Sequence, residues 1–412
     1  MSRPRRGRKH LIALVGLPAR GKTFTARKLA GYLSWLGYPT HVFNVGERRR
    51  RELGPGQGHE FFDPANRDAA ILREQIADQT LDDAMAWLLD DGRVAIYDAT
   101  NASRERRGAI AARSAAEDCD LLFVEIVNRE PAVVESNLRE TKLSSPDYAG
   151  VDEATALRDF QARIAHYESV YESLGEDEGA WIRIVDRGRK VEIHEVYGWI
   201  PGRIVSFLTN LQVTRRPIWL TRHGQSEWNV LGKIGGDAKL SPQGRVYAEN
   251  LAAHVRGHFG ASGDLDVFTS TLRRTLETAA PLGIEPGPWK ALDEIHAGIC
   301  DGMSYAEIAA AMPDEFEARK RDKYTYRYPR GESYQDVVQR VDRVIIELER
   351  YRTPVLVIAH RAVLRALYGY FLQIRPAETP HLPMPLHTVI QVRPTAYGCE
   401  EERVVLEPRV AE

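Results

Sequence analysis

Two groups of residues in this sequence have the types and spacing needed for phosphate chemistry. The first is Gly16-Leu-Pro-Ala-Arg-Gly-Lys-Thr23, which directly follows an apolar, strand-like run. Glycine lets successive backbone N–H groups curve around phosphate oxygens, while Lys22 neutralises them and Thr23 can ligate Mg²⁺. This pattern predicts a nucleotide phosphate site formed by Gly16, Leu17, Pro18, Ala19, Arg20, Gly21, Lys22 and Thr23.

Charged residues follow other strand-like runs in the same half. Asp98 closes VAIYD, where it could hold Mg²⁺ or its water, accept a proton, or cap the following turn. Arginine clusters at residues 47–51 and 104–107 also follow strand ends. Such clusters usually face solvent, but this placement favours a second phosphate group, because guanidinium forks match phosphate oxygens.

The second group combines two histidines with two arginines. Arg222-His223-Gly224 and His360 end apolar runs, and Arg274 follows a third. This set suits phosphoryl transfer through histidine: His223 attacks phosphorus, while Arg222, Arg274 and His360 stabilise the equatorial oxygens.

A carboxylic acid must then protonate the leaving group and later deprotonate water. Glu294 is the best candidate by its position between these motifs, with His296 as a weaker competitor. No cofactor is required for this half, and no spacing there resembles a zinc site.

The 412 residues predict two domains, because so long a chain exceeds one ordinary hydrophobic core. Strands alternate with helices in the first half, which predicts a parallel sheet covered on both faces, with residues 172–179 as a surface loop. The pattern restarts near Thr214, where TRRP is a plausible linker. We therefore expect an α/β domain over residues 1–214 and another over 215–412.

Bulk composition favours a globular cytoplasmic enzyme. The net charge of −2 gives no general attraction to nucleic acid or anionic membrane. Three cysteines, far apart and odd in number, fit a reducing compartment. The sequence contains no apolar run of about 20 residues, which is the length needed to span a membrane.

Together, several long stretches resemble the 6-phosphofructo-2-kinase/fructose-2,6-bisphosphatase family over nearly the whole chain. They are VGLPARGKT, YPTHVFNVGE, YDATNASRERR, TKLSSPDY, TRHGQSEWN, GKIGGD, DKYTYRYPRGESYQD and PLHTVIQVRPTAYGC. The resemblance implies a P-loop kinase domain, then a histidine phosphatase domain of the phosphoglycerate mutase type. It also suggests a homodimer.

The resemblance implies roles for individual residues. ATP and Mg²⁺ would bind the phosphate loop, Thr23 and Asp98, with nucleotide contacts from Asn137 to Lys142. Fructose 6-phosphate would be held by Arg49, Arg73, Thr100, Arg106, Lys142, Arg163 and Tyr167. In the phosphatase half, His223 would be phosphorylated and Glu294 would donate the proton. The 2-phosphate would be surrounded by His360, Arg222, Asn229 and Arg274. The sugar and its 6-phosphate would be held by Gly235, Tyr305, Arg319, Lys323, Tyr334 and Arg365.

The sequence departs from the family at three positions. Asn128 replaces a cysteine near the ATP site, and His296 gives the proton donor a titratable neighbour. Arg361 adds a positive charge that could tighten bisphosphate binding or face solvent. The leading hypothesis is a bifunctional enzyme. The alternatives are a histidine phosphatase with a non-catalytic, ATP-sensing P-loop domain, and a nucleotide-dependent scaffold in which both sites only bind.

Overall fold

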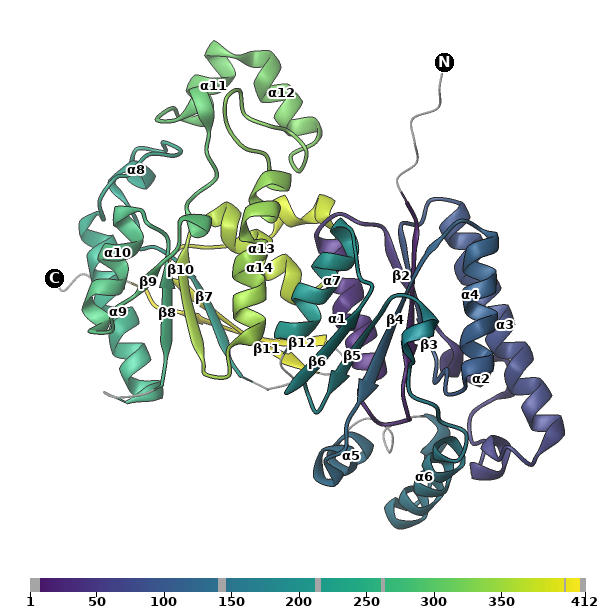
Figure 1. Ribbon diagram of the computed structural model, residues 1–412. Helices are drawn as coiled ribbons and strands as arrows, with labels where there is room; N and C mark the ends of the chain where they lie inside the picture. The colour runs from purple at the N-terminus through teal and green to yellow at the C-terminus, as the bar shows by residue number, and fades with distance from the viewer. Residues whose placement is uncertain (1–7, 140–145, 212–215, 261–263, 396–397, 408–412) are drawn as a thin grey trace, which may run out of the picture. The chain divides into compact units, whose positions relative to one another are not determined.

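The computed structural model describes residues 8–139, 146–211, 216–260, 264–395 and 398–407. These residues form two compact units, divided after Leu211, and each unit is built on a six-stranded sheet (Figure 1). Helices accompany both sheets, and parallel pairing dominates in each. The predicted α/β fold class is confirmed.

The first unit alternates strands and helices, as the sequence predicts. Its elements are β1 His10–Val15, α1 Lys22–Trp35, β2 Thr40–Asn44, α2 Val45–Leu53, η1 His59–Phe62, α3 Arg67–Leu89, β3 Val94–Asp98, α4 Arg104–Ala116, β4 Asp120–Val127, α5 Pro131–Asn137, η3 Pro146–Tyr148, α6 Glu153–Glu168, η4 Glu176–Glu178, β5 Trp181–Val185, β6 Lys190–His194 and α7 Trp199–Asn210.

The first sheet has the order β2-β3-β1-β4-β5-β6. Pairing is parallel from β2 through β5, whereas β6 returns antiparallel beside β5 at the edge. Leu11, Ala13 and Val15 pack with α3 and α4 on one face, and α1 and α7 cover the other (Figure 1). The carboxyl ends of β1, β2 and β3 therefore meet at one edge, which collects the residues that follow them.

The second unit is also an α/β unit built on a six-stranded sheet. Its elements are β7 Ile218–Arg222, α8 Glu227–Val230, α9 Pro242–Phe259, β8 Asp266–Thr269, α10 Arg273–Ala279, η5 Ala280–Leu282, β9 Gly287–Pro288, η6 Lys290–Leu292, η7 Gly298–Cys300, α11 Tyr305–Ala311, α12 Pro313–Arg321, α13 Tyr334–Arg350, β10 Val355–Ala359, α14 Arg361–Phe371, η8 Pro376–His381, β11 Thr388–Thr395 and β12 Gly398–Val405.

The second sheet has the order β12-β11-β7-β10-β8-β9. The strands β7, β10, β8 and β9 pair in parallel, and β11 runs antiparallel to both β7 and β12. Helices α9 and α10 pack on one face, while α13 and α14 cover the other (Figure 1). The ends of β7, β10 and β8 consequently lie side by side.

Two predicted loops take part in packing. Thr214 and Arg215 of the predicted linker lie outside the described residues, but Arg216 is buried and donates to the Leu348 carbonyl. The prediction of a linker is therefore wrong at Arg216, which belongs to the second unit. The surface loop at residues 172–179 is exposed for the most part, yet Leu174 is buried within it.

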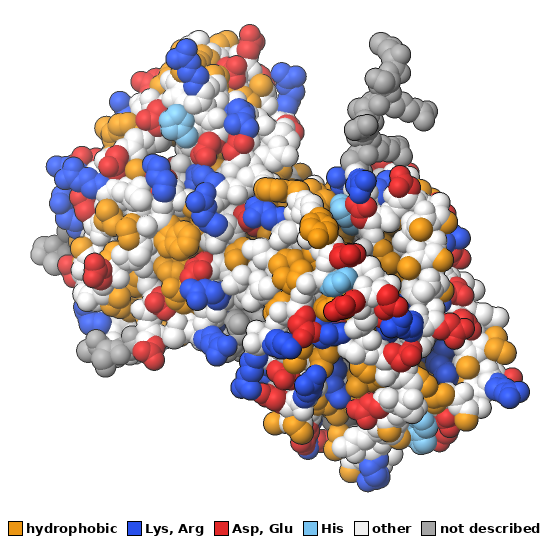
Figure 2. Space-filling model, in the orientation of Figure 1, with side chains coloured by type: hydrophobic (Ala, Val, Ile, Leu, Met, Phe, Trp, Pro, Cys, Tyr) orange, Lys and Arg blue, Asp and Glu red, His pale blue; other side chains and the backbone are white. Residues whose placement is uncertain are grey.

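The surface mixes charges of both signs. Figure 2 shows Lys and Arg side chains interspersed with Asp and Glu side chains on the face in view. Every helix among the described residues is too short or too polar to cross a lipid bilayer.

Candidate active sites

The turn between β1 and α1 has the backbone geometry of a phosphate loop. Gly16 has φ +135°, and a Cβ there would lie 2.5 Å from the Ile126 carbonyl oxygen, so only glycine fits. Ala19 and Gly21 also have positive φ, at 60° and 99°. The Lys22 ammonium donates to the Leu17 carbonyl at 2.7 Å, which folds its charge back over the loop.

Asp98 lies beside this loop, at the carboxyl end of β3. Strand pairing sets Tyr97 opposite Ala13, and Gly16 N–H donates to the Thr100 carbonyl at 3.1 Å. The Asp98 carboxylate is buried and accepts a hydrogen bond from the Asn44 amide. Helix α4 is capped by Ser103 instead. The carboxylate is therefore held at the loop by its strand.

Arg49 and Arg163 converge next to the aromatic ring of Phe62. Their guanidinium carbons lie 5.2 Å and 3.6 Å from the ring centroid, and Tyr167 packs on the same ring. Both arginines form ion pairs with Asp147, at 4.0 Å for Arg163. Within the described part of the chain, Arg49 Nε and Nη1 and Arg163 Nε are buried donors without an acceptor. Such donors suit an anionic ligand.

Other expected kinase-site residues bind protein groups in this structure. Arg73 donates to the Phe61 carbonyl, and Arg106 pairs with Asp78 and the Tyr97 hydroxyl. Asn137 does approach the phosphate loop, donating to the Ala19 carbonyl at 3.0 Å. Lys142 lies outside the described residues.

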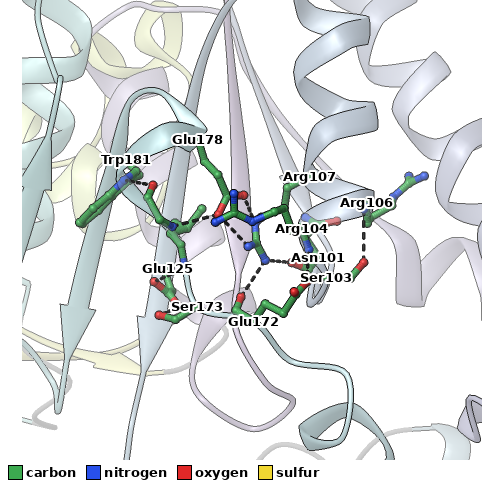
Figure 3. A network of polar contacts seen from close by, with 12 residues as sticks. Asn101, Ser103, Arg104, Arg106, Arg107, Glu125, Glu172, Ser173, Glu178 and Trp181 are labelled. Atoms are coloured by element: carbon green, nitrogen blue, oxygen red, sulfur yellow. Dashed lines mark hydrogen bonds and ion pairs between the residues drawn. The ribbon is translucent and has the colours of Figure 1, made fainter.

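The second arginine cluster divides into separate roles (Figure 3). Arg107 is fully buried, binds Glu178 through two nitrogens, and donates to the carbonyls of Asn101, Ala102 and Glu172. Arg104 pairs with Asp177 at the surface. Arg107 therefore supports the turn after Asp98 structurally, a role that the sequence pattern does not reveal.

In the second unit, His223 follows β7 and is held in one tautomer. Its Nδ1 lies 2.7 Å from the Gly224 carbonyl oxygen, which can only accept, so the proton is on Nδ1 and Nε2 keeps its lone pair. Burial, then the charges of Arg274 and Arg222, hold the pKa of His223 well below 6.5. The side chain is thus a neutral imidazole with a nucleophilic Nε2.

His360 ends the neighbouring strand β10 and lies close to His223. The ring centroids are 5.1 Å apart, and Ser270 Oγ lies 2.8 Å from His360 Nε2. Among the described residues, His360 Nδ1 and Arg222 Nε are buried without hydrogen-bond partners. Burial is the main cause that lowers the pKa of His360, Arg222 and Arg274. These groups form a desolvated, positively charged pocket.

Glu294 faces this pocket from the segment after η6. Its Oε1 accepts the backbone N–H groups of Ile295 at 3.0 Å and Ala362 at 3.3 Å. Ala362 lies in the first turn of α14, two residues after His360. The structure thus places the candidate acid beside the helix that follows His360, where its charge acts on Arg222 and Arg274. His296, in contrast, is exposed.

Residues expected to bind the sugar form two linked groups. Arg319 donates to the hydroxyls of Tyr305 and Tyr328, at 3.0 and 2.8 Å. Arg365 donates to the Tyr334 hydroxyl at 3.1 Å. Lys323 is influenced by an arginine of each group. Burial, followed by the positive charges of Arg365, Arg319 and Arg361, lowers the pKa of Lys323 to about 8.

Two further expected contacts, Asn229 and Gly235, lie in α8 and in the loop that follows it. Asn229 Oδ1 accepts the Ser226 N–H at 3.0 Å and so caps α8. Gly235 has φ +77°, and a Cβ there would collide with the Asp301 carboxylate. Both residues therefore have a structural role in shaping this loop.

Three further residues near the two sites are Arg361 and Asn128, which depart from the family, and His387. Arg361 is exposed, and its charge lowers the pKa of both Arg222 and Lys323. Asn128 is buried just past the end of β4. His387, not singled out in sequence, packs on Tyr247, and burial lowers its pKa; protonation of His387 would oppose protonation of His223. The sequence did offer one signal for His387: it stands directly before an apolar strand, just as His223 stands directly after one.

Comparisons with known proteins cover both units. A 6-phosphofructo-2-kinase family model matches residues 1–215, and a histidine phosphatase superfamily (branch 1) model matches residues 218–406. A solved mycobacterial glucosyl-3-phosphoglycerate phosphatase is 29% identical, covers 47% of this chain and 98% of its own, and has a TM-score of 0.39.

Three curated relatives carry the name 6-phosphofructo-2-kinase/fructose-2,6-bisphosphatase. The Arabidopsis thaliana protein is 46% identical over 98% of this chain and 55% of its own length. The Gallus gallus protein is 46% identical over 96% of this chain and 84% of its own. The Homo sapiens protein, numbered 4, is 46% identical over 96% and 85%. The chain thus spans about half of the plant relative and most of the vertebrate ones.

Proposed function

This chain belongs to the 6-phosphofructo-2-kinase/fructose-2,6-bisphosphatase family, and we propose that its two units make and break the same ester bond. The first unit transfers the γ-phosphoryl group of ATP to the 2-hydroxyl of fructose 6-phosphate. The second unit hydrolyses that 2-phosphate. Among the structural features, the neutral His223, with its free Nε2 in an arginine-lined pocket, supports this proposal most directly.

In the kinase unit, the phosphate loop binds ATP through its backbone N–H groups and Lys22. Arg49 and Arg163 hold the 6-phosphate of the acceptor, since their buried donors suit phosphate oxygens. Asp98 accepts the proton of the attacking 2-hydroxyl or orients it. Lys142 is expected to steady the transferring group.

The kinase residues also suit Mg²⁺. This ion prefers oxygen ligands, and the Thr23 hydroxyl and the buried Asp98 carboxylate are oxygen donors at the phosphate loop. When bound there, Mg²⁺ would neutralise phosphate charge. Thr23 and Asp98 are the residues that would hold it.

In the phosphatase unit, His223 Nε2 attacks phosphorus in line, forming a P–N bond as the P–O2 bond breaks. Glu294 donates its proton to the leaving 2-oxygen. A water molecule then attacks the phosphohistidine, Glu294 takes up a proton from that water, and inorganic phosphate leaves. Arg222, Arg274 and His360 stabilise the equatorial oxygens in both steps. No step uses a cofactor.

One assay tests the whole proposal. The protein is incubated with ATP, Mg²⁺ and fructose 6-phosphate, and the product is examined for an acid-labile bisphosphate. A parallel sample receives fructose 2,6-bisphosphate and is examined for phosphate release. Both products are expected. Phosphate release without bisphosphate synthesis would replace the bifunctional proposal with the ATP-sensing phosphatase.

A further inference from the structure

Two histidines face each other between η1 and α6, and the chemistry proposed for the active sites uses neither. His59 Nδ1 lies 3.4 Å from His166 Nε2, and the rings stack with centroids 5.7 Å apart. The side chains are 37% and 24% exposed, so a dissolved ion can reach them.

The outer nitrogen of each ring faces a carboxylate. His59 Nε2 lies 3.4 Å from Glu60 Oε1, and His166 Nδ1 lies 3.8 Å from Asp63 Oδ1. A neighbouring carboxylate favours the N–H on the nitrogen that it faces, which leaves the lone pair on the other nitrogen. The two inner nitrogens would then present lone pairs to each other. That arrangement is repulsive unless a proton or a metal cation lies between them.

The spacing of the inner nitrogens fits a transition-metal ion. Zn–N bonds of about 2.0–2.1 Å at a tetrahedral angle separate two nitrogens by about 3.4 Å. Carboxylates also lie near His59, because one ligand atom each from His59, Glu60 and Asp159 lie within 4.8 Å of one another, a group that does not include His166. Asp159 is fixed by the Tyr148 hydroxyl at 2.6 Å and by the His59 backbone N–H at 2.8 Å.

We propose that His59 Nδ1 and His166 Nε2 bind a divalent transition-metal ion such as Zn²⁺, with water as its remaining ligands. Glu60 and Asp63 orient the two rings from behind, as carboxylates commonly do for metal-binding imidazoles. Imidazole ligands select this class of ion over Mg²⁺. The ion would tie η1, which carries Phe62, to α6, which carries Arg163 and Tyr167.

The test is a titration of the metal-stripped, full-length protein with Co²⁺ in excess Mg²⁺ and without nucleotide. Equilibrium dialysis counts bound Co²⁺, and visible absorption reports imidazole ligation. We expect one Co²⁺ that Zn²⁺ displaces and Mg²⁺ does not. His59→Gln and His166→Gln should each lose it, and Asp63→Asn should weaken it about 10-fold or more.

His41→Gln is the matched control, because His41 is an exposed histidine on β2 of the same unit. It should bind Co²⁺ as the unaltered protein does. Thermal unfolding in EDTA checks that each variant is folded. If one histidine variant fails to fold, the other and Asp63→Asn still decide the outcome. Equal Co²⁺ stoichiometry and spectra in the unaltered protein and the folded variants would overturn the proposal.

Discussion

His223 and His360 lie ring beside ring, with centroids 5.1 Å apart and planes tilted by 54°. They follow two paired strands: Arg222 of β7 is opposite Ala359 of β10, and His223 N–H donates to the Ala359 carbonyl at 3.1 Å. Parallel pairing therefore brings together two imidazoles that are 137 residues apart in sequence, as their numbers show. Both are buried, which favours the neutral form required for attack on phosphorus.

Replacing the nucleophile should separate the two activities. We expect His223→Ala to abolish bisphosphatase activity and to leave the kinase largely unaffected, because the residue lies in the second unit alone. Assays of both reactions on one sample measure this. His258→Ala, at an exposed position on α9, serves as the control and should retain both activities. Equal loss of both activities in folded His223→Ala would contradict the assignment.

The opposite separation is expected at the phosphate loop. Lys22→Ala should remove the kinase activity and spare the bisphosphatase, since charge stabilisation of a transferring phosphoryl group is worth several kcal/mol, or about 10²–10³ in rate. Arg27→Ala, which removes a surface ion pair with Glu47, is the control in the same helix. A Lys22→Ala enzyme with near-normal kcat would refute this role.

The protonation state of His223 can be followed directly. Because burial and two arginines lower its pKa, the ring should stay neutral as the pH falls from about 8 to about 6, where an ordinary histidine becomes half protonated. Nitrogen-15 NMR of histidine-labelled protein should show an Nδ1–H tautomer throughout this range. A midpoint near pH 6.5 for His223 would contradict the burial argument.

Substrate binding by the phosphatase should weaken at alkaline pH. The pKa of Lys323 is lowered to about 8, so its positive charge is present below that pH and is lost as the pH rises through it. We expect KM for fructose 2,6-bisphosphate to increase between about pH 7 and pH 9. Lys323→Arg keeps its charge and should show a smaller increase. The same pH dependence in both proteins would exclude Lys323 as the cause.

Arg107 should contribute to stability. Arg107→Met leaves the Glu178 carboxylate and three carbonyls without their buried partner, which typically costs about 3–5 kcal/mol. Urea unfolding of the first unit measures this change. Arg104→Ala, three positions earlier, removes an exposed pair with Asp177 and should change stability little. Equal unfolding midpoints for the two variants would contradict this account.

Sequence alone determined the α/β class and the phosphate chemistry of both units, because loops such as Gly16–Thr23 and Arg222–Gly224 carry their signal locally. The alternation of strand-like and helix-like segments also predicted which residues lie at strand ends. It did not predict the antiparallel strands β6, β11 and β12, since pairing direction depends on the path of the connecting chain.

Only the tertiary structure decided what each charged residue contacts. Arg104 and Arg107 are equivalent in a local pattern, yet one is exposed and the other is buried among carbonyls from distant segments. The pairing of His59 with His166, 107 positions apart, likewise arises from the packing of η1 on α6. Burial and long-range proximity set these electrostatic environments, and neither is encoded in the spacing of residues along the chain.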